Sequence, residues 1–192
     1  MASEESKKPG ETCVIDPDGD LRFELDGVRL LVSSKALSLA SDVFSRMLQS
    51  RFKEGLANHQ GPGQPSVSLP EDNPEIMKTI CWQIHHCNDV MPERMDPSLL
   101  LTLAEHCDKY DCSGALKCWA TLMIARFERV QTKEEDERKL LVAAYVFDLP
   151  GSFTWSSFWI ISSQVGPFTG LPGVSDHPLI PSIAGIAASA TS

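Results

Sequence analysis

The chain has 192 residues, enough for one domain with a buried core and some additional segments. Its formal net charge is −9, from 26 acidic and 17 basic residues. Such a charge repels phosphate backbones and anionic membrane surfaces, and no apolar run approaches the ~20 residues that span a bilayer. We therefore expect neither nucleic acid nor a membrane as a partner.

The first residues, MASEESKKPGETC, carry acidic side chains and lack the apolar core and cleavage site of a secretory signal. We therefore expect an intracellular protein, in the cytoplasm or the nucleus, whose six cysteines are reduced thiols. Residues 1–17 are polar and interrupted by proline and glycine, which predicts a flexible leader.

A β-hairpin is the first regular element that the pattern predicts. Apolar residues occupy every second position on both sides of Asp26-Gly27, namely Leu21, Phe23, Leu25, Val28, Leu30 and Val32. This alternation turns one face of each strand inward, and Asp-Gly tolerates the positive φ of a tight turn.

After Val32 the spacing of apolar residues changes from two to three or four, which predicts helical structure through Leu48. Ser33 or Ser34 is expected to cap a first helix and Ser41 a second, since short oxygen side chains accept from unpaired backbone N–H groups. The chain has no G-x-S-x-G motif, so we expect no catalytic serine and no enzyme.

The remaining pattern predicts a short strand and four further helices. The strand, over 67–69, follows a loop over 57–66. The helices are predicted to begin near residues 73, 96, 113 and 132. Ser113 is expected to cap the third of them, and a Thr132-x-x-Glu135 capping box the fourth.

The last part of the chain differs in composition. Beyond Pro150 the only charged side chain is Asp176. The stretch FTWSSFWII (153–161) predicts a strand or a helix that docks on the core, followed by disorder from about Gly166. We therefore expect residues 151–192 to be a low-charge tail, weakly docked and then disordered.

Four groups of residues at the junctions of these elements follow one another in a characteristic order. They are Gly19-Asp20-Leu21, Val32-Ser33-Ser34-Lys35-x-Leu37-x-x-x-Ser41-x-x-Phe44, Phe52-x-Glu54-Gly55 and Leu103-Ala104-x-x-x-Asp108-Lys109-Tyr110-Asp111-Cys112. In this order they resemble the BTB/POZ family, and the Ser-Ser-Lys form is similar to that of small filamentous-fungal members. The resemblance covers residues 18–127, with a helical extension over 128–150.

The resemblance implies an α+β fold in which a helical cluster is flanked by short β-strands. It also implies a protein–protein interaction module without a catalytic centre or a cofactor. Many members of the family form homodimers, and some are adaptors that bring substrates to a cullin-type ubiquitin ligase. We therefore expect protein partners, either a second copy of the chain or a cullin-type scaffold.

The resemblance also suggests which residues take part in these contacts. In many animal members, a histidine before the first helix joins the aspartate of the first strand in a charged pocket at the dimer surface. Asp20 occupies the aspartate position here, but Ser33 occupies the histidine position. This departure weakens the expectation of that pocket and of a strand-swapped dimer. Four apolar residues of the region are expected at or just beneath the contact: Leu21, Phe23, Leu37 and Val43.

The cullin-binding members carry a hydrophobic-x-Glu motif after the second helix, and Phe52-Lys53-Glu54 matches it. A phenylalanine near the surface with an acidic neighbour would form a small contact site with an apolar anchor and a polar rim. In the alternative reading, Phe52 belongs to the core and Glu54 is solvated.

Cysteines and histidines crowd together in the middle of the chain: Cys81, His85, His86, Cys87, His106, Cys107, Cys112 and Cys118. Cys81 and His85 are four residues apart and would share one face of a helix. However, no C-x-x-C or H-x-x-x-H pair is present, so we expect buried thiols and no metal. Two alternatives remain open beside the BTB/POZ module: a monomeric scaffold subunit resembling elongin-C or Skp-type proteins, and a small structural-zinc protein.

Overall fold

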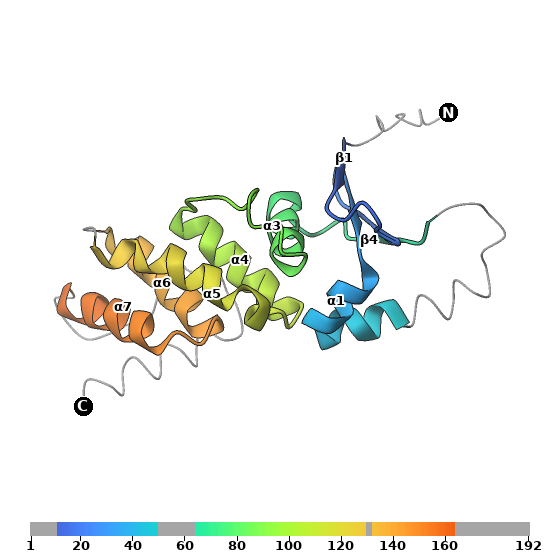
Figure 1. Ribbon diagram of the computed structural model, residues 1–192. Coiled ribbons are helices and arrows are strands. Elements are labelled where there is room, and N and C mark those ends of the chain that lie inside the picture. The colour runs from blue at the N-terminus through green and yellow to red at the C-terminus, as the bar shows by residue number, and fades with distance from the viewer. Residues whose placement is uncertain (1–10, 50–63, 130–131, 164–192) are drawn as a thin grey trace, which may run out of the picture. The chain divides into compact units, whose positions relative to one another are not determined.

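The computed structural model describes residues 11–49, 64–129 and 132–163 (Figure 1). Within these residues the protein is α+β, as predicted, with a small sheet near the N-terminus and helices through the rest. The chain divides into two compact units, Met1–Met91 and Pro92–Ser192. This division lies inside the region of the BTB/POZ resemblance, 18–127, because the helices that follow Pro92 pack on one another.

The sheet of the first unit has four strands in the order β1-β3-β2-β4. These strands are β1 (Glu11–Val14), β2 (Leu21–Glu24), β3 (Val28–Val32) and β4 (Ser66–Ser68). β2 and β3 are antiparallel, whereas β1 is parallel to β3 and β4 is parallel to β2. Gly27 closes the hairpin with a φ of 73°, which glycine adopts without strain. The predicted hairpin and short strand are thus confirmed.

One face of the hairpin forms the core of the first unit. The inward side chains are almost fully buried: Leu21, Phe23, Leu30 and Val32. Phe23 packs against Phe44 of the helical segment 42–49, and their ring centroids are 5.9 Å apart. The alternation in the sequence therefore predicts the buried side chains correctly except at Val28, which is half-buried at the start of β3.

Strand β1 differs from the flexible leader that the sequence predicts for residues 1–17. Its four residues pair in register with β3, with Cys13 opposite Leu30. The strand is short and lies at the edge of the sheet, and its Val14 side chain is exposed. Backbone hydrogen bonds hold such an edge strand, and they leave no alternating signal in the sequence. Residues 1–10 lie outside the described residues.

The helices of the first unit are α1 (Ser34–Ala40), the helical segment 42–49, and α3 (Pro74–Ile84). The Ser33 hydroxyl accepts from the Ala36 N–H at 3.4 Å, and the Ser41 hydroxyl accepts from the Phe44 N–H at 2.9 Å. The serines at these two helix starts are therefore caps, as their positions in the sequence predict.

The second unit consists of α4 (Pro97–Lys109), α5 (Ser113–Ala125), the short 3-10 helix Phe127–Arg129, α6 (Glu134–Val146) and α7 (Pro150–Ser163). Helix α6 packs against both α4 and α7 (Figure 1). Its buried face carries Leu140, Leu141 and Ala144. α6 is thus the central helix of this unit.

The starts of α5 and α6 differ from the prediction. Cys112 is the N-cap of α5 and Lys133 is the N-cap of α6, and neither forms a side-chain cap hydrogen bond. The expected capping box is wrong because α6 begins one residue too late for it, and the Thr132 hydroxyl donates to Glu137 instead. Acidic side chains in the first turn of α6 interact favourably with the positive end of the helix dipole, and this interaction stabilises the helix start without a side-chain cap.

Helix α7 is the ordered part of the predicted low-charge tail. Its buried side chains are Ser152, Ser156, Ser157 and Ile160, and they lie on the face that packs against α6. Small serines allow the two helix backbones to approach closely without a cavity. The disorder predicted from about Gly166 concerns residues that lie outside the described ones. None of the helices in the described residues is both long and apolar enough to cross a bilayer.

Candidate protein-interaction site

The corner where β2 begins and β3 ends brings the Gly19-Asp20 pair next to the start of α1. Leu21 lies opposite Val32 in the antiparallel pair, and the Asp20 N–H donates to the Val32 carbonyl at 3.1 Å. A Cβ atom at Gly19 would lie 2.9 Å from the backbone oxygens of both Asp16 and Val32. Only glycine fits this close approach, which gives the Gly19-Asp20 motif a physical reason.

Asp20 binds the start of α1 through Ser34. Its carboxylate accepts from the Ser34 N–H at 2.7 Å and from the Ser34 hydroxyl at 2.6 Å. Partial burial raises the pKa of the Asp20 carboxyl, but the hydrogen bonds from Ser34 outweigh this effect and hold the pKa below its usual value. Asp20 is therefore a charged, exposed residue that fixes the junction between the hairpin and α1.

A histidine reaches the same junction from a distant part of the sequence. The Ser33 N–H donates to His85 Nε2 at 2.9 Å, and His85 Nδ1 lies 2.7 Å from the Cys81 carbonyl oxygen. Because a backbone N–H can only donate, Nε2 accepts, and Nδ1 carries the proton that it donates to Cys81. His85 thus binds the backbone of Ser33, the residue that the predicted resemblance aligns with the histidine of many animal BTB/POZ members.

The predicted contact residues fall into two groups. Leu21, Phe23 and Leu37 are at most 1% exposed, so they belong to the core and cannot touch a partner directly. Asp20 is exposed, and Ser33 and Val43 are half-buried. The core positions could not be distinguished from interface positions in the sequence, because both are apolar and share one periodicity. Phe52 and Glu54, expected in cullin binding, lie outside the described residues.

Leu39 is the apolar side chain of α1 that the sequence analysis missed. It is 80% exposed and lies on the helix that the Asp20 junction anchors. Val43, half-buried, follows four residues later in the helical segment 42–49. The signal was present in the sequence, because Leu39 is an apolar residue off the buried stripe of its helix. We define the outer α1 surface as Leu39 and Val43, on the helical segments that the Asp20 junction precedes.

The cysteines and histidines of the middle region do not gather around a common point. The described residues contain no group of three or more His, Cys, Asp or Glu side chains placed to hold a metal ion. Both ring nitrogens of His85 are in hydrogen bonds, and Cys81 is buried. Burial raises the pKa of the Cys107 thiol well above its ordinary value, as does its hydrogen bond with Cys112, and both effects disfavour the thiolate that binds zinc.

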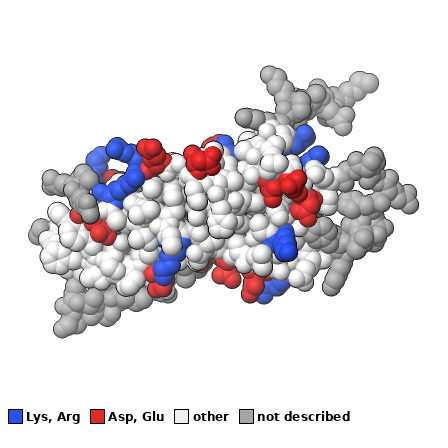
Figure 2. Space-filling view, viewed as in Figure 1, with Lys and Arg blue, Asp and Glu red and all other residues white. Residues whose placement is uncertain are grey.

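Helix α7 leaves three aromatic side chains exposed. Trp155, Phe158 and Trp159 are exposed, Phe158 to 67%. The apolar stretch 153–161 predicts an element that docks on the core, but α7 buries serines and Ile160 there and leaves these aromatic side chains exposed. Figure 2 shows charged side chains in small separate groups on the face in view, with uncharged surface between them.

Comparison with known proteins adds no further relationship. No family model matches the chain, and no sequence among the curated proteins matches it. The resemblance to BTB/POZ proteins therefore remains a prediction that rests on the motif residues and on the order of the elements.

Proposed function

We propose that the chain is a BTB/POZ-like protein-interaction module that acts inside the cell, in the cytoplasm or the nucleus. It works by self-association or as an adaptor, for example for a cullin-type ubiquitin ligase, and not by catalysis. The observation that carries the proposal is the junction at α1. There Gly19, Asp20 and Ser34 of the family-like motifs meet in space and fix the helix that bears Leu39.

The order of elements supports the same proposal. A hairpin is followed by two short helical segments, a strand parallel to β2, and then helices, which is the mixed arrangement that the resemblance implies. The outer α1 surface carries an exposed apolar residue, Leu39, on a helix whose start is fixed by the charged Asp20. Burying one leucine side chain contributes about 1.5–3 kcal/mol, so this surface can supply the centre of a small interface.

Light scattering on the full chain, separated by size exclusion over a wide concentration range, tests the proposal. A homodimer would have about twice the chain mass of 21.1 kDa. A mass of one chain at every concentration would contradict self-association and favour the alternative, a monomeric scaffold subunit that resembles elongin-C or Skp-type proteins. Binding of a purified cullin N-terminal region by the chain, but not by a Phe52→Ala, Glu54→Ala double variant, would support the adaptor role.

A further inference from the structure

A buried carboxylate lies in the first turn of α6. Glu137 is 3% exposed, and its Oε1 accepts a hydrogen bond from the Thr132 hydroxyl. Its second oxygen, Oε2, is buried and has no hydrogen-bond partner among the described residues. A buried carboxylate oxygen without a donor is costly, so a group that donates a hydrogen bond to it stabilises it. Oε2 of Glu137 can therefore accept a hydrogen bond from a donor that the described residues do not supply.

Glu137 lines a small pocket between the start of α6 and the end of α7. The pocket has a volume of about 70 Å³, and its other lining residues are Thr132, Glu134, Trp159, Ile160 and Ser163. A single water needs about 10–15 Å³, so a larger polar head group fits. The partial exposure of Trp159 shows that one wall faces solvent.

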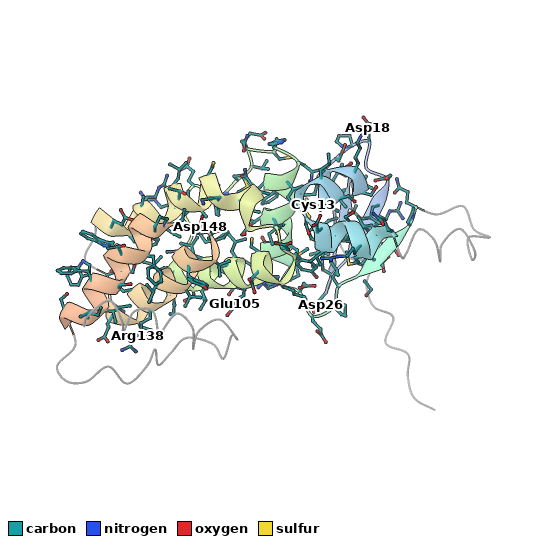
Figure 3. All side chains as sticks on the ribbon, turned by 90° about the horizontal axis from the view of Figure 1, so that it is seen from below. Cys13, Asp18, Asp26, Glu105, Arg138 and Asp148 are labelled. Carbon is teal, nitrogen blue, oxygen red and sulfur yellow. The ribbon has the colours of Figure 1, made fainter. Side chains whose placement is uncertain are left out.

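The charges around the pocket favour a cation. Glu134 and Glu137 both line it, and Glu134 forms an ion pair with Arg138, labelled in Figure 3. Glu137 forms no ion pair within the described residues, so one negative charge in the pocket is not balanced there. An anion would be repelled by both carboxylates, and a neutral apolar group would leave Oε2 without a donor.

We propose that this pocket binds a primary ammonium group of the kind carried by a lysine side chain. An ammonium has three N–H donors, and the lining residues with oxygen acceptors include Glu137, Thr132 and Ser163. The indole ring of Trp159 adds a favourable surface for a cation. Residues 164–192, which follow α7 directly, contain no lysine or arginine and cannot supply this ammonium. The occupant that we infer is a lysine side chain of a partner protein.

A nuclear magnetic resonance titration tests this inference on the full chain labelled with ¹⁵N. The indole N–H signal of Trp159, assigned with a Trp159→Phe variant, is followed during addition of N-acetyl-lysine-methylamide. N-acetyl-norleucine-methylamide, of similar length but without the ammonium, is the matched ligand. We expect a saturable shift with the lysine compound and none with the norleucine compound. Free butylamine, which carries an ammonium group but no peptide backbone, is the third ligand. If it shifts the Trp159 signal as much as the lysine compound does, the ammonium group alone is sufficient for binding.

Two variants test whether the charge of Glu137 is responsible for binding the ammonium group. Glu137→Gln keeps the shape of the side chain and removes its charge, and we expect it to weaken binding about tenfold or more. Glu135→Gln is the control, because Glu135 is exposed on the same helix turn and does not line the pocket. Circular dichroism verifies that both variants are folded.

Three results would overturn the inference. They are the absence of a shift with the lysine compound, an equal shift with the norleucine compound, and unchanged affinity in the Glu137→Gln variant. The first two come from the unaltered chain and do not depend on how any variant folds. The pocket lies entirely within the second unit, so none of these measurements involves the outer α1 surface of the proposed function.

Discussion

Asp20 stabilises the first unit only while its carboxyl is ionised. Its pKa in the folded protein lies below the value of about 3.8 expected in the unfolded chain. The stabilisation is therefore fully present above about pH 4 and is lost as the pH falls through the lower, folded pKa. Apolar packing does not titrate, so this pH dependence distinguishes the stabilisation by the Ser34 hydrogen bonds from that by apolar packing.

We expect Asp20→Ala to lower the stability by about 1 kcal/mol at pH 7, since it removes the acceptor for two donors at the start of α1. The melting temperature would fall by roughly 2–4 °C. The difference from the unaltered chain should shrink below about pH 3. Asp18→Ala, at the exposed residue labelled in Figure 3, is the control and should melt like the unaltered chain. An equal loss in both variants would contradict the role of Asp20.

His85 connects α3 to the start of α1 through the Ser33 N–H. We expect His85→Ala to destabilise the chain by about 1–2 kcal/mol in denaturant unfolding, because a partly buried donor loses its acceptor. His86→Asn is the control, since His86 is exposed and asparagine tolerates its positive φ. A His85→Ala chain as stable as the control would show that the hydrogen bond contributes nothing measurable.

The same two bonds of His85 bear on the structural-zinc alternative. A zinc ligand needs a free ring nitrogen, and both nitrogens of His85 are used. We therefore expect elemental analysis of the purified chain to find much less than one zinc per chain. Treatment with a chelator should leave the melting temperature unchanged. One zinc per chain, together with a lower melting temperature after chelation, would instead support the zinc protein.

At the scale of elements, local patterns in the sequence predict most of the first unit, but they do not predict strand β1 or the buried face of helix α7. The hairpin and the serine caps depend on neighbours within a few residues, so period and side-chain type reveal them. Strand β1 depends on the backbone of β3, some 17 residues away in register, and its side chains carry no comparable pattern. Helix α7 reverses the usual rule, with serines inside and aromatic rings outside.

This reversed face of α7 yields a prediction. Ser156 is 2% exposed, and replacing it by leucine forces a larger, branched side chain into a close contact with α6. We expect Ser156→Leu to lower the stability by about 1–3 kcal/mol through overpacking. Ser162→Leu, the same change at an exposed position of α7, should stay within about 0.5 kcal/mol. Thermal unfolding of both variants measures the difference, and a neutral Ser156→Leu would show that α7 packs loosely.

At the scale of the whole molecule, the outer α1 surface is the place where self-association is expected. If the chain forms a dimer, Leu39→Asp should weaken it about tenfold or more, since a charge would replace the apolar anchor. Leu122→Asp on α5 is the matched control, because Leu122 is 64% exposed and belongs to the second unit. Sedimentation equilibrium gives the dissociation constants, and an equal effect of both variants would place the contact elsewhere.

The sequence by itself determined the elements whose cause is local: the β2–β3 hairpin around Asp26-Gly27, the helix caps at Ser33 and Ser41, and the α+β class. These depend on backbone preferences and on hydrogen bonds between neighbours. Only the tertiary structure decided that the inward-facing Leu21, Phe23 and Leu37 are core and not interface, that His85 binds Ser33 across 52 residues, and that Glu137 is buried beside a pocket. Burial and long-range contacts depend on how elements pack, and one-dimensional periodicity carries no information about which elements meet.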